Sequence, residues 1–191
     1  MPDVKYCYPG SDVLINKLDI KNSKDLFEAE KKFTFIRLME LQENPVKGNF
    51  DFKHLKAIHG YIFQDIYAWA GKERTVEIGK GNLFCTTACI NDYAKSVFDK
   101  YLPQCFAAKG NKDDFVRALA ENYGDLNALH PFREGNGRTL RTFMELFVNY
   151  INSYLDMPDM AIHYSLWDDN DREELLKSNI ICSLNGDTSG I

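Results

Sequence analysis

The apolar positions of the chain follow a helical pattern over most of its length. Residues 1–22 contain YCYPG and short polar turns, so we expect an irregular segment there. Ser23 is of a residue type that caps helices, and apolar residues recur at helical intervals after it. These residues are Leu26, Phe33, Ile36 and Leu41. The pattern predicts a first helix that begins at Ser23.

A second helix is predicted from about Phe52, and Gly71 is its expected end. Its apolar face consists of Leu55, Ile58, Ile62, Ile66 and Trp69. The pattern then changes, because the short β-type runs TVEI and LFCT flank the glycine turn GKGN. This arrangement predicts a β-hairpin over residues 74–87.

Helical spacing resumes at 91–108, where Pro103 is expected to bend or split the helix, and continues at 113–129. Further helices are predicted after residue 139 and at Asp171–Ile181. The apolar stripes of the middle two consist of Val116, Leu119, Tyr123 and Leu126, and of Leu140, Phe143, Met144, Phe147 and Ile151. No repeat or linker interrupts the chain. The prediction is an all-α fold with one β-hairpin, in a single domain over residues 1–191.

Composition narrows the function classes without naming one. The 191 residues are 45% hydrophobic, which suffices for one core, and the net charge of −5 argues against attraction of the whole protein to nucleic acid or anionic membranes. Five scattered cysteines (Cys7, Cys85, Cys89, Cys105, Cys182) favour reduced thiols over a zinc site. With no basic-then-apolar leader and no apolar run that could span a bilayer, we expect a soluble, cytoplasmic protein.

Candidate chemistry is concentrated in residues 129–141, LHPFREGNGRTLR, between two predicted helices. Gly135 and Gly137 permit unusual backbone angles, so successive N–H groups can converge on one anion at a helix N-terminus. Asn136 adds a side-chain donor. Arg138 and Arg141, three residues apart, lie on one side of the new helix and can both face the same oxyanion.

Two further residues of the segment indicate a reaction. A carboxylate such as Glu134 is repelled by phosphates unless a cation lies between them, and Mg²⁺ prefers one or two carboxylates plus phosphate oxygens. His130 can accept a proton at cellular pH. A base, a metal ligand and an anion nest together favour transfer of a phosphoryl-type group.

Each residue also has an ordinary structural interpretation. His130 alone would be a helix cap or a core residue, GNG alone a turn, and Glu134 with the arginines a solvated salt bridge. Phe132 and Pro131 are interpreted as structural, an apolar plug and a rigid entry to the loop. At this spacing, however, the complete set favours the functional interpretation.

The segment His130–Arg138, followed by Arg141, resembles the signature HPFx[DE]GNGRxxR of Fic-domain proteins. YCYPG…LINKL, FQDIYAWAGKER and the hairpin are similar to small bacterial Fic proteins of the FicT toxin type, from about Tyr6 to Cys182. The resemblance implies a helical core with a β-hairpin flap. It also implies AMPylation, the transfer of AMP from ATP to a protein hydroxyl with release of pyrophosphate.

The resemblance further implies a role for each matching residue. His130 would take the proton of the attacking hydroxyl, and Glu134 would hold Mg²⁺ at the α- and β-phosphates. The nest of Gly135, Asn136 and Gly137 would grip the phosphates, Arg138 the diphosphate and Arg141 the γ-phosphate. The flap, formed by Ile78, Gly79, Lys80, Leu83, Phe84 and Cys85, would pair with the target by strand addition. The alternative for the flap is an ordinary surface hairpin.

Many Fic proteins are inhibited by a helix with the motif [ST]xxxE[GN], which this chain lacks. The nearest segment is Ser165–Asn170, SLWDDN, where Asp169 stands in place of glutamate, and we interpret it as a helix start. The chain therefore resembles a toxin restrained by a separate small antitoxin. Its ending, NGDTSGI, indicates a chain truncated before a further helix that similar proteins have.

Three functions remain open at this point. The first is an adenylyltransferase, for which the resemblance suggests DNA gyrase and topoisomerase IV as targets. The second is a Doc-like kinase that transfers the γ-phosphate with the same loop, although the intact GNGR argues against it. The third is a nucleotide-binding regulator without catalysis, against which the presence of both His130 and Glu134 argues.

Overall fold

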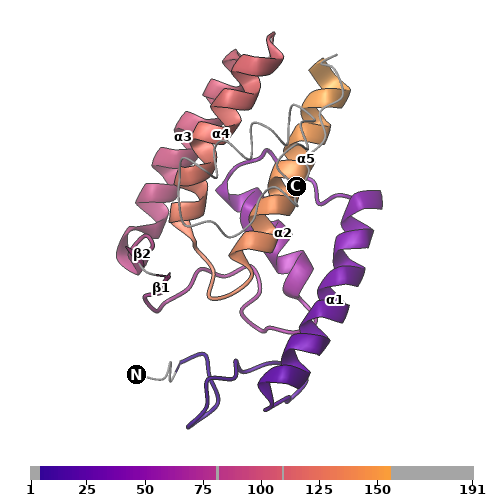
Figure 1. The fold of residues 1–191 in the computed structure, drawn as a ribbon, viewed down its shortest axis with the longest axis vertical. Coiled ribbons are helices and arrows are strands. Elements are labelled where there is room, and N and C mark those ends of the chain that lie inside the picture. Colours follow the sequence, from indigo (N-terminus) through magenta and orange to yellow (C-terminus); the bar gives the residue numbers. More distant parts are fainter. Residues whose placement is uncertain (1–4, 81, 109, 156–191) are drawn as a thin grey trace, which may run out of the picture. The chain divides into compact units, whose positions relative to one another are not determined.

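A computed structural model of the protein describes residues 5–80, 82–108 and 110–155. Within them lie five α-helices and one pair of short strands (Figure 1). The helices are α1 (Ser23–Glu43), α2 (Phe52–Phe63), α3 (Ile90–Ala107), α4 (Lys112–Leu129) and α5 (Asn136–Leu155). The strands are β1 (Gly79–Lys80) and β2 (Asn82–Leu83). The predicted all-helical character is confirmed.

The described residues form two compact units. Thr87 and the described residues before it form the first unit together with Pro131–Thr139. Ala88–His130 form the second unit together with the described residues from Leu140 onward. The first unit thus includes the glycine-containing loop, although that loop lies more than forty residues beyond Thr87 in the sequence.

Helix α1 packs against α2 in the first unit, but not with the face that the sequence predicted. Leu26 and Leu41 are buried as expected, whereas Ile36 is 52% exposed. The buried stripe continues instead through Glu30 and Thr34, at helical spacing from Leu26. The prediction was wrong because it assigned only apolar residues to the core-facing stripe, and these two polar residues have partners elsewhere in the unit.

The start of α1 and the end of α2 also differ from the prediction. The N-cap is Asn22 rather than Ser23, because the Asn22 side chain accepts hydrogen bonds from two N–H groups of the first turn. Helix α2 ends at Phe63, well before Gly71. Just beyond its end, Asp65 forms a two-point ion pair with Arg37 of α1.

The residues after α2 nevertheless stay in the core. Ile66 is fully buried, and its C=O accepts a hydrogen bond from the N–H of Lys17 at 2.8 Å. Trp69 stacks on Tyr67 with ring centroids 4.3 Å apart. The apolar pattern therefore continues past the helix because burial continues, not because the helix does.

Helices α3 and α4 pack side by side in the second unit (Figure 1). The expected split of α3 at Pro103 does not occur, because a proline removes only its own N–H donor and Tyr101 and Cys105 remain fully buried on either side of it. The predicted stripe of α4 is confirmed as buried, as is that of α5. Aromatic rings connect these helices: Tyr101 lies 5.2 Å from Phe147 between ring centroids.

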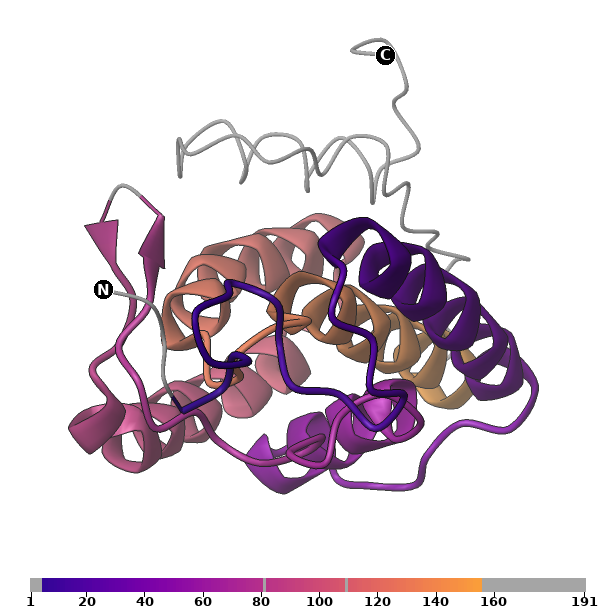
Figure 2. The ribbon, with the colours of Figure 1, turned by 90° about the horizontal axis from the view of Figure 1, so that it is seen from below.

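The strands β1 and β2 pair antiparallel, with Gly79 opposite Leu83 and Lys80 opposite Asn82 (Figure 2). They fall within the predicted hairpin of residues 74–87. The predicted helix Asp171–Ile181, the segment Ser165–Asn170 with Asp169, and Cys182 all lie outside the described residues. In the part of the chain that is described, no helix is both long enough and apolar enough to cross a membrane, and the cysteines there (Cys7, Cys85, Cys89 and Cys105) form no disulfide.

Candidate active site at the glycine-containing loop

The loop Pro131–Thr139 is shaped by one glycine that no other residue could replace. Gly135 has a φ of 82°, in the left-handed region, and a Cβ added to it would lie 2.2 Å from the ring of Phe63. Gly137, in contrast, is the second residue of α5 and has a helical backbone. The unusual backbone angle expected of both glycines is therefore needed at Gly135 alone.

Asn136 closes the loop. Its side-chain Oδ1 accepts from the N–H of Phe132 at 2.8 Å, and its Nδ2 donates to the C=O of the same residue at 2.7 Å. The sequence had suggested that this side chain would donate to phosphates. Both ends of the amide instead hold the backbone of Phe132, so the Asn136 side chain stabilises the shape of the loop.

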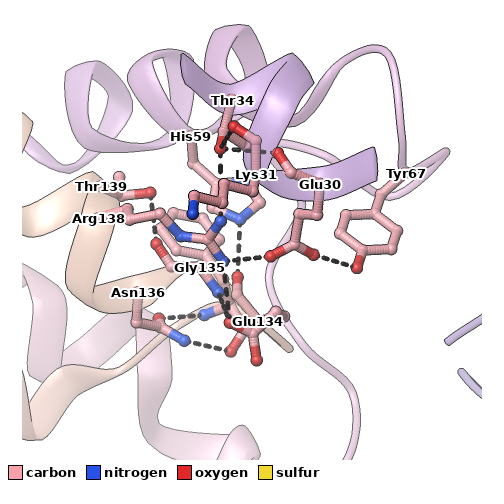
Figure 3. Close-up of polar contacts among 11 residues, drawn as sticks. Glu30, Lys31, Thr34, His59, Tyr67, Glu134, Gly135, Asn136, Arg138 and Thr139 are labelled. Carbon is pink, nitrogen blue, oxygen red and sulfur yellow. Dashed lines mark hydrogen bonds and ion pairs between the residues drawn. The ribbon is translucent and has the colours of Figure 1, made fainter. Parts of the chain in front are cut away.

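The donors at the start of α5 converge on a negative charge (Figure 3). The first intrahelical hydrogen bond of α5 runs from Thr139 N–H to Gly135 C=O, so the N–H groups of residues 136–138 lie ahead of it, at the positive end of the helix. Here the Glu134 carboxylate oxygen Oε1 accepts from the Gly135 N–H at 2.8 Å and from Arg138 Nη2 at 3.3 Å. The loop therefore already binds one anionic oxygen with a backbone donor and a guanidinium.

Arg138 also binds a second carboxylate, which the sequence analysis missed. Glu30 of α1 accepts from Arg138 Nη2 and from the Tyr67 hydroxyl (Figure 3). Burial in this environment, together with the Glu30 carboxylate, raises the pKa of Tyr67 above its usual value, so the hydroxyl keeps its proton and donates it. Glu30 lies in the buried stripe of α1, four residues after Leu26 and four before Thr34, but no apolar pattern in the sequence marks it.

His59 of α2 packs against the loop Pro131–Thr139 and hydrogen-bonds to its backbone. It is fully buried, and its ring stacks on Phe132 with centroids 3.8 Å apart. The Gly71 N–H donates to His59 Nδ1 at 2.8 Å, so the ring proton of the neutral histidine is on Nε2, which donates to the Glu134 C=O at 3.0 Å. Burial lowers the pKa of His59 to about 4, which keeps the ring neutral at cellular pH.

Arg74 connects the loop to the hairpin. Its N–H donates to the Pro131 C=O at 2.8 Å. Its fully buried guanidinium binds the C=O groups of Val76 and Cys85, which lie on opposite arms of the hairpin. The predicted flap residues thus have a fixed base: Phe84 N–H donates to the Ile78 C=O at 3.3 Å, while Leu83 of β2 is 73% exposed.

His130 ends the first stretch of the second unit and directly precedes the loop in the chain. It caps α4 with a left-handed backbone, φ 40° and ψ 59°, which is costly for a residue other than glycine. Its Nδ1 lies 3.2 Å from the C=O of Asn127 and must donate to it, so the neutral ring carries its lone pair on Nε2. That tautomer gives Nε2 the ability to accept a proton.

Arg141 lies one turn beyond Arg138 on α5 and is partly exposed. The helical spacing places the two arginines on one side of α5, as the sequence predicted.

The expected Mg²⁺ can be tested against the residues of the loop. Among the described residues, no group of three or more His, Cys, Asp or Glu side chains could hold a metal ion. Mg²⁺ does not need such a group, because phosphate oxygens and water supply most of its ligands. The Glu134 side chain is 45% exposed, so its carboxylate is accessible from solvent. Glu134 therefore fits the part of a single carboxylate ligand.

Comparisons with known proteins identify the family of the chain. Residues 49–148 match the model of the Fic/DOC family. The chain is 35% identical to the protein adenylyltransferase VbhT of Bartonella schoenbuchensis over 92% of its own length but only 35% of that protein. It is 36% identical to y4lH of Sinorhizobium fredii, which also carries an adenylyltransferase name, over 78% of each chain.

A solved structure matches as well. It is the N-terminal Fic domain of a VirB-translocated Bep effector from Bartonella quintana, crystallised with bound ADP. The TM-score is 0.75 at 26% identity, and the match covers 93% of each chain.

Proposed function

The chain belongs to the Fic/DOC family, and we propose that it transfers AMP from ATP to a hydroxyl side chain of a target protein. The relatives that match most of the chain are named protein adenylyltransferases, so the chain is a nucleotidyltransferase enzyme. The ADP bound by the similar Fic domain supports ATP as the nucleotide. The observation that carries the proposal is the convergence of Gly135 N–H and Arg138 on one anionic oxygen.

Each residue of the candidate site has its own role in the proposed reaction. His130 Nε2 takes the proton of the attacking hydroxyl, whose oxygen forms a bond to the α-phosphorus while the bond from that phosphorus to the leaving pyrophosphate breaks. The start of α5, with Gly135, Asn136 and Gly137, binds phosphate oxygens through backbone N–H groups. Arg138 binds the leaving diphosphate and Arg141 the γ-phosphate.

Glu134 holds Mg²⁺, which supplies positive charge for the phosphates when it is bound. In the nucleotide-free protein the same carboxylate accepts from Gly135 and Arg138, so it must give up those donors when phosphates arrive. Because the side chain is accessible from solvent, it can turn outward without burying its charge.

The target docks on the hairpin, at Ile78, Gly79, Lys80, Leu83, Phe84 and Cys85. An extended segment of the target adds to the hairpin edge by main-chain hydrogen bonds, which read no particular side chain and place a hydroxyl at the site. The support is the exposed side chain of Leu83 in β2 and the fixed base of the hairpin at Arg74.

We also propose that the enzyme is the toxin of a toxin–antitoxin pair. Residues 1–191 contain no inhibitory motif [ST]xxxE[GN], and in the proposed pair a separate small antitoxin carries the inhibitory glutamate. A type II topoisomerase subunit is the candidate target. Expression of the wild type should stop bacterial growth and that of His130→Ala should not; equal growth of the two would contradict the toxin role.

Labelled ATP tests the central proposal. The purified chain is incubated with Mg²⁺ and a bacterial lysate, with ATP labelled at the α- or the γ-phosphorus, beside the His130→Ala variant. Protein label from the α-position alone, lost in the variant, is the expected result. Label from the γ-position alone would make the protein a Doc-like kinase. Binding of ATP without label from either position would make it a non-catalytic regulator.

A further inference from the structure

Glu30 is a buried carboxylate for which the proposed reaction has no use. It lies on α1, far from the loop in sequence, and its side chain is only 10% exposed. A buried carboxylate is costly unless it is paired and hydrogen-bonded, so its surroundings show what it serves.

Each oxygen of Glu30 has one partner (Figure 3). Oε1 accepts from Arg138 Nη2, and Oε2 accepts from the Tyr67 hydroxyl. Because Tyr67 is itself buried, it fixes the carboxylate in one orientation. Glu30 therefore presents a stationary negative charge to the guanidinium of Arg138.

Other groups orient the same guanidinium. The Thr34 hydroxyl donates to the Glu30 C=O at 2.8 Å, which turns its lone pairs toward Arg138 Nη1 at 3.5 Å. The ring of Phe63 lies 4.9 Å from Arg138 Cζ, within the range of a cation–π contact. These groups come from α1 and α2, so the side chain of Arg138 is held by helices other than its own.

The two carboxylates on Arg138 Nη2 are not equivalent. Glu134 is 45% exposed and bonds at 3.3 Å, whereas Glu30 is buried and also held by Tyr67. When phosphates compete for Arg138, Glu134 can be solvated on leaving, but Glu30 would become an unpaired buried charge. Nucleotide binding must therefore displace Glu134 and leave Glu30 in place.

We propose that Glu30 is a positioning residue, which holds Arg138 in the orientation that meets charge developing on the leaving diphosphate. The inference rests on the proposed function, because Arg138 is assigned its phosphate there. Orientation of this kind is realised in the transition state and contributes mainly to kcat. The Glu30 charge also offsets that of Arg138, so its removal makes the site more positive toward ATP.

The variant Glu30→Gln tests the proposal, with Glu28→Gln as the matched control at an exposed position of the same helix. We expect Glu30→Gln to lower kcat for AMP transfer about tenfold or more, without raising the KM for ATP. Glu28→Gln should change neither. Unchanged kcat in Glu30→Gln, or a higher KM at the same kcat, would overturn the proposal.

A double-mutant cycle separates positioning from a general structural effect. If Glu30 acts through Arg138, Glu30→Gln should have no further effect on kcat in an Arg138→Ala background. An equal loss in both backgrounds would overturn the proposal. Tyr67→Phe removes only one hydrogen bond from Glu30, so it should lower kcat in the same direction by a few-fold, and it serves if Glu30→Gln does not fold.

A spectroscopic measurement separates this proposal from the proposed function. Rotation of the Arg138 guanidinium, followed by ¹⁵N NMR of its side-chain nitrogens, should be slow in the wild type and faster in Glu30→Gln. If the wild type transfers no AMP, the proposed function fails, and this measurement still decides whether Glu30 restrains Arg138. Equal rotation rates in the two proteins would refute the restraint.

Discussion

The loop Pro131–Thr139 and the hairpin strands β1 and β2 lie in the same compact unit but are held in opposite ways. In the loop, Glu134, Asn136 and Arg138 each make contacts with side-chain or backbone groups that are largely buried. In the hairpin two pairs of described residues are in register, and Leu83 of β2 is exposed. A site that binds phosphates needs its donors held in a fixed geometry, whereas main-chain pairing with a protein segment needs only an accessible edge.

The base of the hairpin belongs with the loop in this comparison. Arg74 binds both arms, and Glu77 accepts from the Thr87 N–H at 3.0 Å and from the Thr87 hydroxyl at 2.7 Å. The hydrogen bonds from Thr87 hold the pKa of Glu77 below its ordinary value. The hairpin is therefore held by side-chain hydrogen bonds at its base, from Arg74 and Glu77, whereas Leu83 farther along it is exposed.

The largest effect on stability and on AMP transfer is expected from Gly135→Ala, which changes the backbone of the loop Pro131–Thr139. The left-handed φ and the overlap with Phe63 together should cost about 3 kcal/mol of stability, and AMP transfer should fall more than about a hundredfold because the donors separate. Thermal unfolding and the α-label assay measure both. Gly110→Ala is the control, since a Cβ there meets nothing within 4 Å. Normal transfer in Gly135→Ala would refute the rigidity of the loop.

A low pH should destabilise the folded protein by protonating His59, which packs against the loop Pro131–Thr139. Its pKa is about 4 in the folded protein and about 6.5 when unfolded, so its contribution to stability is complete above pH 6.5 and is lost as the pH falls toward 4. Between pH 8 and pH 5 the loss should be about 2 kcal/mol, measured by urea unfolding. His59→Gln should be less stable at pH 8 but should lack this part of the pH dependence. An equal loss in both proteins would assign it to other groups.

Arg74→Lys tests the fixed base of the hairpin. Lysine keeps the charge but cannot bind the Val76 and Cys85 carbonyls with one planar group, so we expect a stability loss of about 1–2 kcal/mol. Transfer to the target should fall about tenfold, while the KM for ATP stays the same. If the variant had a raised KM for ATP but modified the target normally, Arg74 would belong to nucleotide binding rather than to the hairpin.

The smallest effect on stability is expected from a substitution at Leu83 of the hairpin. Leu83→Ser should change the free energy of unfolding by less than about 0.5 kcal/mol, because the side chain is exposed. Modification of the target should nonetheless fall several-fold at unchanged KM for ATP. Ile36→Ser, at another exposed apolar position, is the control. Equal modification by both variants would mean that the target does not dock at Leu83.

The helices, and the apolar stripes of α4 and α5, could be predicted because they follow from the spacing of apolar residues along the sequence, whereas the stripe of α1 includes polar residues and was missed. The stripe of α5, for example, repeats every three or four residues, and its members from Leu140 to Ile151 are buried. The end of α2 could not be predicted in this way, since the apolar pattern continues past Phe63 to Ile66, which is buried outside the helix.

The candidate site could likewise be predicted only in part from the sequence. The motif HPFREGNGR predicted backbone donors at the start of α5, because N–H groups at a helix start need no distant partner. The pattern assigned the Asn136 side chain to phosphates, and the structure uses it to hold Phe132. Glu30, Thr34 and His59 were missed because polar residues within an apolar stripe acquire meaning only from partners about 75 to 108 positions away.

The pairing of Glu30 with Arg138 has a consequence for protein synthesis. The two residues are 108 positions apart, so at roughly 5–20 residues per second a ribosome needs on the order of ten seconds to supply the arginine after the glutamate. Until then the buried carboxylate of α1 lacks its cation, and the segment Pro131–Thr139 that completes the unit is missing. A nascent chain interrupted before that segment has neither the nest nor the restrained arginine, so a cell that makes this enzyme meets its activity only after translation has passed the loop.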